Sequence, residues 1–95
     1  MKAIIAKAKV QQGKEAEFEK VALELARQVE ANEPGNKLYK LCRSADGDYL
    51  FIELYDSNEA MAEHGAAPHM KEAGPKFFSL MAGRPEITVL DVLGD

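Results

Sequence analysis

The chain has 95 residues, of which 46% are apolar, and both values are typical of a single folded domain. Its net charge is −4 and its lysines are scattered, so it lacks the basic patch that nucleic acid or an anionic membrane attracts. No apolar run is long enough to span a membrane, and the N-terminus lacks the apolar core of a signal peptide. We therefore expect one cytoplasmic domain over residues 1–95 that binds neither nucleic acid nor membrane.

The first half of the chain predicts a strand followed by a long helix. Residues 2–10 alternate apolar and polar side chains, as in a half-buried strand. From Lys14 the apolar residues return every third or fourth position, which predicts an amphipathic helix over 14–31. Pro34 and Gly35 end this helix, because a proline disfavours helical geometry in the residue before it.

Two further strands are predicted over 37–43 and 49–55, joined by a hairpin turn centred on Asp46 and Gly47. The second of these strands is apolar on both faces apart from Glu53, so we expect both of its faces to be buried. The helices of one chain cover only one face of a single sheet. We therefore predict a homodimer, in which a second copy covers the other face.

A helix is predicted next, and either Asp56 or Ser57 is placed to cap its N-terminus. Glu59 is placed to complete a capping box onto Asp56. The helix includes His64 and is expected to loosen at Gly65, because glycine is a poor helix former.

A further helix is predicted over 68–81, because Pro68 suits the first turn of a helix. Gly74-Pro75 predicts a kink or a break within it, since proline lacks the backbone N–H donor. Alternation returns over 86–92 and predicts a last strand. The order β-α-β-β-α-β predicts an α+β, ferredoxin-like fold with an antiparallel sheet backed by helices.

Several segments resemble the antibiotic biosynthesis monooxygenase-like domain, including the small quinol-monooxygenase-like proteins, over essentially the whole chain. They are V-x-x-G-K-E-x-E-F (Val10 to Phe18), E-P-G-N-K-L-Y (Glu33 to Tyr39), F-I-E-L-Y (Phe51 to Tyr55) and E-A-M-A-E-H-G-A-A-P-H-M-K (Glu59 to Lys71). The resemblance implies a dimeric α+β barrel in which two sheets pack face to face. It also implies a small-molecule substrate and no cofactor, since many relatives oxidise phenols or quinols with dioxygen and without metal or flavin.

Other relatives differ in chemistry, and the resemblance implies alternatives. Haem-degrading relatives use a tryptophan and a haem-ligating histidine, whereas this chain has no tryptophan and carries Gly74 where that histidine would stand. The P-H-M-K stretch and the end from Phe78 to Pro85 are similar to a protein that processes a phosphorylated quorum-sensing sugar derivative. That similarity implies an isomerase or tautomerase of a small phosphorylated carbonyl compound. Arg84 could hold an anionic group of such a substrate, but we favour the alternative that it is a solvated loop residue paired with Glu86. A non-catalytic ligand-binding dimer is the third hypothesis.

His64 and Glu53 are the predicted catalytic residues. An imidazole titrates near neutral pH, and a carboxylate in an apolar strand is costly unless it is paired or protonated. Together they could take a proton from a phenol or an enol. The alternatives are that His64 bonds a backbone carbonyl at the helix break, and that Glu53 forms an ion pair with Lys40, Arg43 or Arg84, within the chain or across the dimer.

No metal site is expected. His64 and His69 are the two histidines, and their spacing of five residues is poor for two ligands on one helical face. No aspartate or cysteine is locally spaced to complete a set. His69 is predicted to contact the substrate or, alternatively, to cap the helix that begins at Pro68. The one cysteine, Cys42, is expected to be buried and inert.

The aromatic residues divide between the core and the expected pocket. Phe51 and Tyr55 share a strand face with Glu53, so they are predicted to lie beside a planar substrate. Tyr39 and Phe77 are further candidates for substrate contact. Relatives often carry a tryptophan where this chain has Tyr55. The first functional hypothesis is therefore a cofactor-independent monooxygenase of quinol- or phenol-like molecules.

Overall fold

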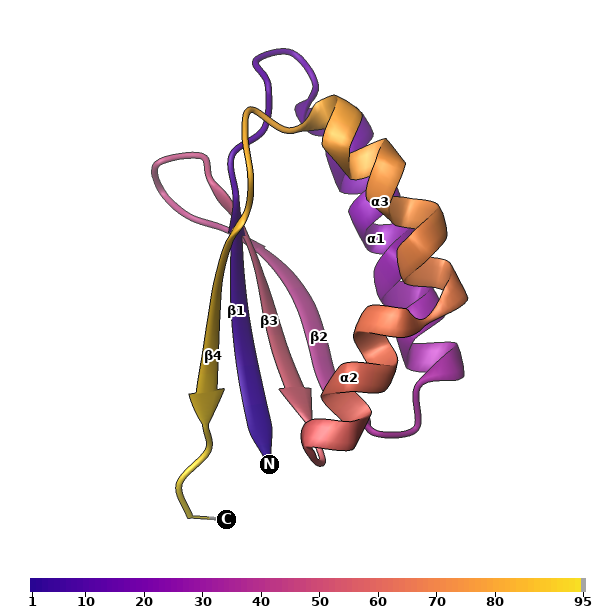
Figure 1. Cartoon of the computed structure of the whole chain (residues 1–95). Helices are drawn as coiled ribbons and strands as arrows, with labels where there is room; N and C mark the ends of the chain where they lie inside the picture. Colours follow the sequence, from indigo (N-terminus) through magenta and orange to yellow (C-terminus); the bar gives the residue numbers. More distant parts are fainter. Residues whose placement is uncertain (95) are drawn as a thin grey trace.

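A computed structural model describes residues 1–94 (Figure 1), and its elements follow the predicted order. They are β1 (Lys2–Ala8), α1 (Glu15–Asn32), β2 (Asn36–Arg43), β3 (Tyr49–Tyr55), α2 (Asn58–Ala66), α3 (Pro68–Leu80) and β4 (Glu86–Asp91). The second helical region is divided into α2 and α3. The prediction of a ferredoxin-like α+β fold is confirmed.

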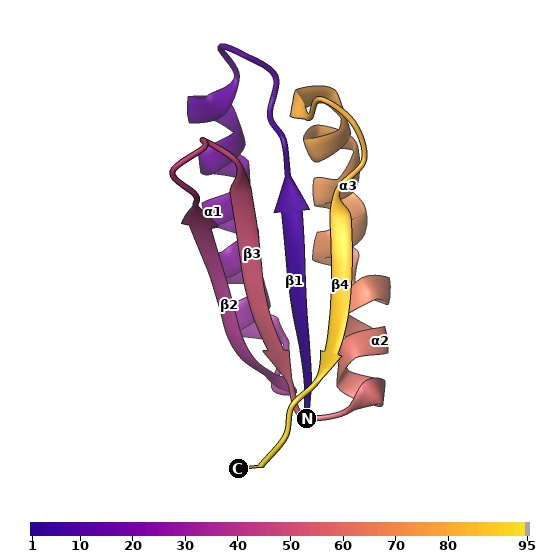
Figure 2. The same ribbon diagram turned by 90° about the vertical axis from the view of Figure 1, so that its left-hand side faces the viewer.

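The four strands form one antiparallel sheet in the order β2-β3-β1-β4. All three helices lie on the same face of this sheet, which gives the molecule two layers (Figure 1). Figure 2 looks onto the opposite face, which no helix of the described chain covers. Within residues 1–94, no helix is long and apolar enough to cross a membrane.

In strand β3, side chains on the helix-covered face are more deeply buried than those on the opposite face. Tyr49, Phe51, Glu53 and Tyr55 point toward the helices and are buried, whereas Leu50, Ile52 and Leu54 alternate with them and are half-buried. One face of the strand is therefore buried, as predicted. Cover of the second face by another copy stays a prediction.

The core fixes α1 over the sheet through one apolar stripe. Phe18, Ala22, Leu25 and Val29 are the buried residues of α1, and their spacing places them on one side of the helix. The Phe18 ring lies 4.9 Å from Tyr49 and 5.3 Å from Phe77, centroid to centroid. Burying each large apolar side chain stabilises the fold by roughly 1.5–3 kcal/mol. This packing determines where the C-terminal end of α1 lies.

The N-terminus of α2 is capped by Ser57, one of the two predicted residues. The Ser57 hydroxyl accepts a hydrogen bond of 3.1 Å from the backbone N–H of Ala60. The predicted capping box from Glu59 onto Asp56 is wrong, because the helix begins one residue later than that pairing requires. Asp56 instead lies 3.5 Å from the ammonium group of Lys37.

Three other local predictions change in detail. Helix α3 has no break at Pro75, because Gly74 has no Cβ to clash with the proline ring, whereas a kink there stays a prediction. Cys42 is exposed rather than buried, since its side chain lies on edge strand β2. The first strand ends at Ala8, and Val10 makes only an isolated bridge to Met81.

Candidate functional site

The loop between α1 and β2 is held against α2 by Gly35. A Cβ atom on Gly35 would lie 2.5 Å from the Cβ of Ala60, so only glycine allows the two segments to approach this closely. The carbonyl of Gly35 also accepts a 2.9 Å hydrogen bond from the N–H of Asp56. Glu33, which caps the C-terminus of α1, is thereby placed beside α2.

The junction between α2 and α3 brings the two histidines together. Ala67 has extended geometry (φ −67°, ψ 146°), and its N–H donates a 3.2 Å hydrogen bond to the carbonyl of His64. Pro68 then begins α3 in a new direction. His64 in the last turn of α2 and His69 in the first turn of α3 therefore face the same point, despite their sequence spacing.

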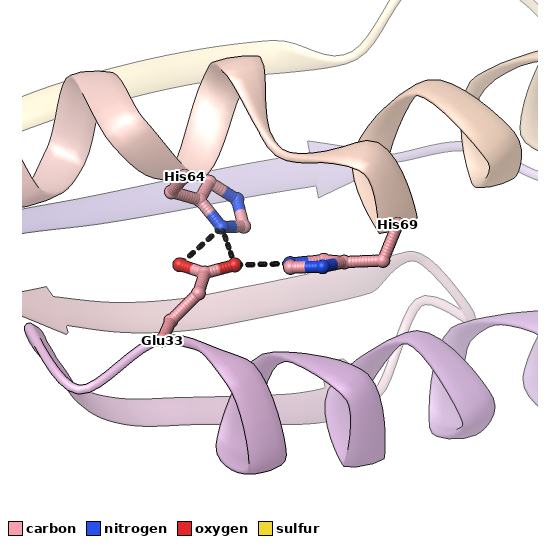
Figure 3. Close-up of side chains that lie close together, drawn as sticks. All are labelled: Glu33, His64 and His69. Atoms are coloured by element: carbon pink, nitrogen blue, oxygen red, sulfur yellow. Dashed lines mark hydrogen bonds and ion pairs between the residues drawn. The ribbon is translucent and has the colours of Figure 1, made fainter.

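The point where they meet is the carboxylate of Glu33 (Figure 3). His64 Nδ1 lies 3.0 Å from Glu33 Oε1 and 2.9 Å from Oε2, and His69 Nε2 bonds the same Oε2 atom. Their side chains are only 7–11% exposed. We call these residues the Glu33–His64–His69 cluster.

The other ring nitrogen of His64 faces a second carboxylate. His64 Nε2 lies 3.7 Å from Glu53 Oε1, and the Tyr55 hydroxyl donates a 2.6 Å hydrogen bond to that same oxygen. The rings of Tyr39 and Tyr55 lie 5.4 and 5.2 Å from the imidazole. His64 is therefore held between two carboxylates and two aromatic rings.

Burial governs the protonation of the groups around His64. Burial raises the pKa of Glu53, and the negative charge of Glu33 raises it further, against the Tyr55 hydrogen bond and the His64 charge. Burial also raises the pKa of Tyr55, to which the hydrogen bond to Glu53 adds, and that of Tyr39. Both phenols are thus kept protonated, and Glu53 is a buried carboxylate with an increased affinity for a proton.

The Glu53 side of His64 opens into a cavity of about 700 Å³. Apart from Glu53, His64, Gln11 and Arg84, its lining is largely apolar and aromatic. Ile87 lines the cavity and is 56% exposed, which shows that the cavity reaches solvent beside β4. On the other side, Glu33 and His69 line a separate groove between α1 and the α2–α3 pair.

The structure places most of the predicted residues at the cavity. Its lining includes the predicted catalytic residues, His64 and Glu53, and three of the predicted substrate contacts, Tyr39, Phe51 and Phe77. Tyr55 lies behind Glu53 and is fully buried, and His69 lines the groove instead. Neither of these two is among the cavity-lining residues.

Within the described part of one copy of the chain, Glu53, His64 and His69 do not make the structural contacts considered as alternatives, whereas an ion pair of Glu53 across a dimer stays a prediction. The nearest polar partners of Glu53 are Tyr55 and His64, and within residues 1–94 it forms no ion pair with a lysine or arginine. The side chain of His64 bonds Glu33, not a backbone carbonyl. The cap of α3 is Ala67, without a side-chain hydrogen bond, so His69 does not cap that helix.

Glu33 is the site residue that sequence reasoning missed. It follows a helix and precedes Pro34-Gly35, a setting typical of a solvated loop. Glu33 lies 31 residues before His64 in the sequence, so no local spacing pattern links the two residues. The only signal was its place in the segment E-P-G-N-K-L-Y, which carried the family resemblance.

The structure is a small α+β domain with a largely apolar cavity against its sheet, and comparison with known proteins identifies its family. The family profile described as antibiotic biosynthesis monooxygenase matches residues 1–76. The chain belongs to the antibiotic biosynthesis monooxygenase family. No protein with a curated functional description matches it.

Solved structures support the same assignment. A proposed antibiotic biosynthesis monooxygenase of Caulobacter crescentus CB15 is 45% identical, with a TM-score of 0.94 over 98% of this chain and 90% of that one. Rv0793 of Mycobacterium tuberculosis is 25% identical, with a TM-score of 0.91 over 99% and 96% of the two chains. SnoaB of Streptomyces nogalater, named a cofactor-independent oxygenase, shares the fold at 21% identity, with a TM-score of 0.83 over 99% and 94%.

Proposed function

We propose that the protein is a cofactor-independent monooxygenase that oxidises a quinol- or phenol-like small molecule in the cavity beside His64. The observation that carries this proposal is the pairing of His64 and Glu53, 3.7 Å apart, on the wall of an otherwise largely apolar cavity. Family membership supports oxygenase chemistry. The name of SnoaB supports a reaction without a cofactor.

The cavity suits a planar, electron-rich substrate. Tyr39, Phe51 and Phe77 offer aromatic walls, and the cavity volume of about 700 Å³ is within the range of small-molecule sites. A hydroxyl group of the substrate would lie at the His64–Glu53 pair. Excluding water there strengthens each hydrogen bond and charge interaction with the substrate.

The proposed reaction begins with proton transfer from the substrate hydroxyl to the His64–Glu53 pair. The resulting anion is electron-rich and reduces dioxygen. One oxygen atom enters the substrate and the other leaves as water. The substrate supplies all four electrons, so a phenol ends as a quinone and a quinol as a hydroxyquinone. The raised pKa of Glu53, caused mainly by burial, favours a carboxylate that accepts a proton.

Oxygen uptake tests this function directly. Hydroquinone is added aerobically to metal-stripped protein, and oxygen consumption and the formation of hydroxy-p-quinone are followed. We expect turnover by the wild type and a loss of about 100-fold or more in His64→Ala, the effect of removing a general base. A rate unaffected by His64→Ala would remove the proposed role of this residue.

A second candidate, an isomerase or tautomerase of a small phosphorylated carbonyl compound, is favoured by Arg84. Its side chain lines the same cavity as Glu53 and His64, and within residues 1–94 it forms no ion pair with Glu86 or another acid. Such a reaction would proceed without oxygen. Anaerobic turnover, with phosphate-dependent binding lost in Arg84→Ala, would favour this function over the oxygenase.

The non-catalytic ligand-binding dimer is less well supported by the cavity. It would be favoured if Met70, Phe77 and Phe78 filled the space, yet the cavity is open and Phe78 is 85% exposed. A tightly bound ligand without turnover under either aerobic or anaerobic conditions would restore this hypothesis.

The homodimer is proposed together with the function. The face of the sheet away from the helices carries an apolar patch across all four strands, made by Ile5, Leu38, Leu50, Ile52, Leu54 and Leu90. A second copy would cover this patch, because large exposed apolar patches mark interaction surfaces. Sedimentation should give a dimer at micromolar concentration and a folded monomer for Ile52→Lys. A monomeric wild type would contradict the proposal.

A further inference from the structure

We propose that the Glu33–His64–His69 cluster is a binding site for a divalent metal ion of the zinc class. The donor set is two imidazole nitrogens and one carboxylate oxygen, and these atoms all lie within 4.8 Å of one another. This set is one that Zn²⁺ and similar ions bind, with water at the fourth position. The proposal does not depend on the oxygenase activity.

The donors are close enough together to share one ion. Ligands about 2.1 Å from a tetrahedral zinc ion lie roughly 3.4 Å from one another. His64 Nδ1 is 2.9 Å from Glu33 Oε2, and His69 Nε2 lies closer to the same oxygen, so both pairs would open as the ion enters. The three side chains come from three elements whose ends are fixed by the Gly35–Ala60 contact and the break at Ala67.

The surroundings of His64 resemble those of a metal ligand. A histidine that binds a metal through one ring nitrogen usually donates the other N–H to a carboxylate. The Nε2 atom of His64 lies 3.7 Å from Glu53, and the Tyr55 hydroxyl holds that carboxylate in place. A proton on Nε2 would leave Nδ1 free to bind the ion in the cluster (Figure 3).

Charge also favours a cation. The Glu33 side chain is 9% exposed, and its partners within residues 1–94 are the two imidazoles, with no lysine or arginine in an ion pair with it. A buried carboxylate is costly unless a cation compensates its charge, and a divalent ion would do so. The groove lined by Glu33 and His69 gives the ion and its water a path from solvent.

Metal titration of the full chain tests the site. Metal-stripped protein is titrated with Zn²⁺ by calorimetry, and Tm is measured with Zn²⁺ and after addition of a chelator. We expect one equivalent of Zn²⁺ to bind and to raise Tm reversibly, because an ion that binds only the folded state stabilises it. Absence of saturable binding, or a Tm that Zn²⁺ does not change, would leave a purely hydrogen-bonded triad and overturn the proposal.

Variants locate the bound ion. His69→Ala should lower Zn²⁺ affinity by more than about 100-fold, since losing a ligand costs at least as much as losing an outer partner. Glu63→Gln, a neutralised acid in the same groove, should bind like the wild type. Equal affinity in His69→Ala and the wild type would overturn the assignment.

A measurement on the wild type covers the case in which His69→Ala does not fold. X-ray absorption of the zinc-loaded protein should show two imidazole ligands among oxygen and nitrogen neighbours. Co²⁺ in place of Zn²⁺ should give the visible absorption of a tetrahedral site. A bound ion without imidazole ligands would place it elsewhere and contradict the proposal.

Discussion

The two ring nitrogens of His64 face two different environments. Nε2 faces Glu53 and a cavity with largely apolar walls, whereas Nδ1 bonds Glu33 beside a groove with several charged residues. The cavity side is built on the sheet, and the groove side is built from the ends of helices. His64 is therefore shared by two sites: the cavity, which suits reaction with a small organic molecule, and the Glu33–His64–His69 cluster, which suits binding of a metal ion.

The difference shows how surroundings assign roles to similar groups. Both Glu33 and Glu53 are carboxylates within reach of the same imidazole. Glu53 accepts a hydrogen bond from a buried phenol and has a pKa raised mainly by burial, which suits proton transfer. Glu33 lies against two imidazole nitrogens, which brings three possible metal-ligand atoms within 4.8 Å of one another.

The largest expected effect is on turnover, and it comes from removing the charge of Glu53 on the cavity side of His64. Glu53→Gln should reduce turnover of hydroquinone about 100-fold or more, because the His64–Glu53 pair that accepts the proton loses its carboxylate. The same variant should weaken Zn²⁺ binding by only about 10-fold, as expected for a partner of a ligand. Glu59→Gln, an exposed acid on α2, is the matched control and should change neither. Wild-type turnover in Glu53→Gln would contradict its catalytic role.

The next effect is on stability, and it concerns the close contact between Gly35 and Ala60 on the groove side of His64. Gly35→Ala should destabilise the fold by about 1–3 kcal/mol, since the new methyl group would overlap Ala60. Gly65→Ala meets no atom within 4 Å inside helix α2, so it should stabilise by about 0.5–1 kcal/mol. Urea unfolding measures both. Changes of the same sign would show that close packing at Gly35 is not what positions Glu33.

The smallest effect concerns the helix that presents His64 to both sides. Ser57→Ala removes the N-cap hydrogen bond of α2 and should cost about 1 kcal/mol in the free energy of unfolding. The control is Ser79→Ala, because the Ser79 hydroxyl only donates to a carbonyl on an exposed face of α3. Its change should stay within about 0.5 kcal/mol. Equal losses in the two variants would argue against the importance of the cap.

The cavity side could be predicted from the sequence in large part. Alternation along β3 places Phe51 and Glu53 on one face, and the near absence of polar residues in that strand marks Glu53 as unusual. Helical periodicity identified the covering face of α1. These patterns are local, and local patterns survive folding when one face of each element is buried.

The groove side could not be predicted, because it depends on contacts between distant segments. The spacing of His64 and His69 is unfavourable on one continuous helix, but the break at Ala67 turns α3 and brings the imidazoles together. Glu33 then joins them from another element. The helix over 68–81 was predicted, but its continuity through Pro75 was not, since Gly74 has no Cβ to clash with the proline ring.

The most direct test of the account is to observe where a phenol binds. Methyl NMR spectra of the wild type are recorded during a titration with hydroquinone under anaerobic conditions. We predict shifts at the methyl groups of Ala6 and Met70, which line the cavity, with little change at Ala60 and Ala67, which line the groove. Shifts at Ala60 and Ala67 without shifts at Ala6 and Met70 would contradict the central claim that the cavity beside Glu53 and His64 receives the substrate.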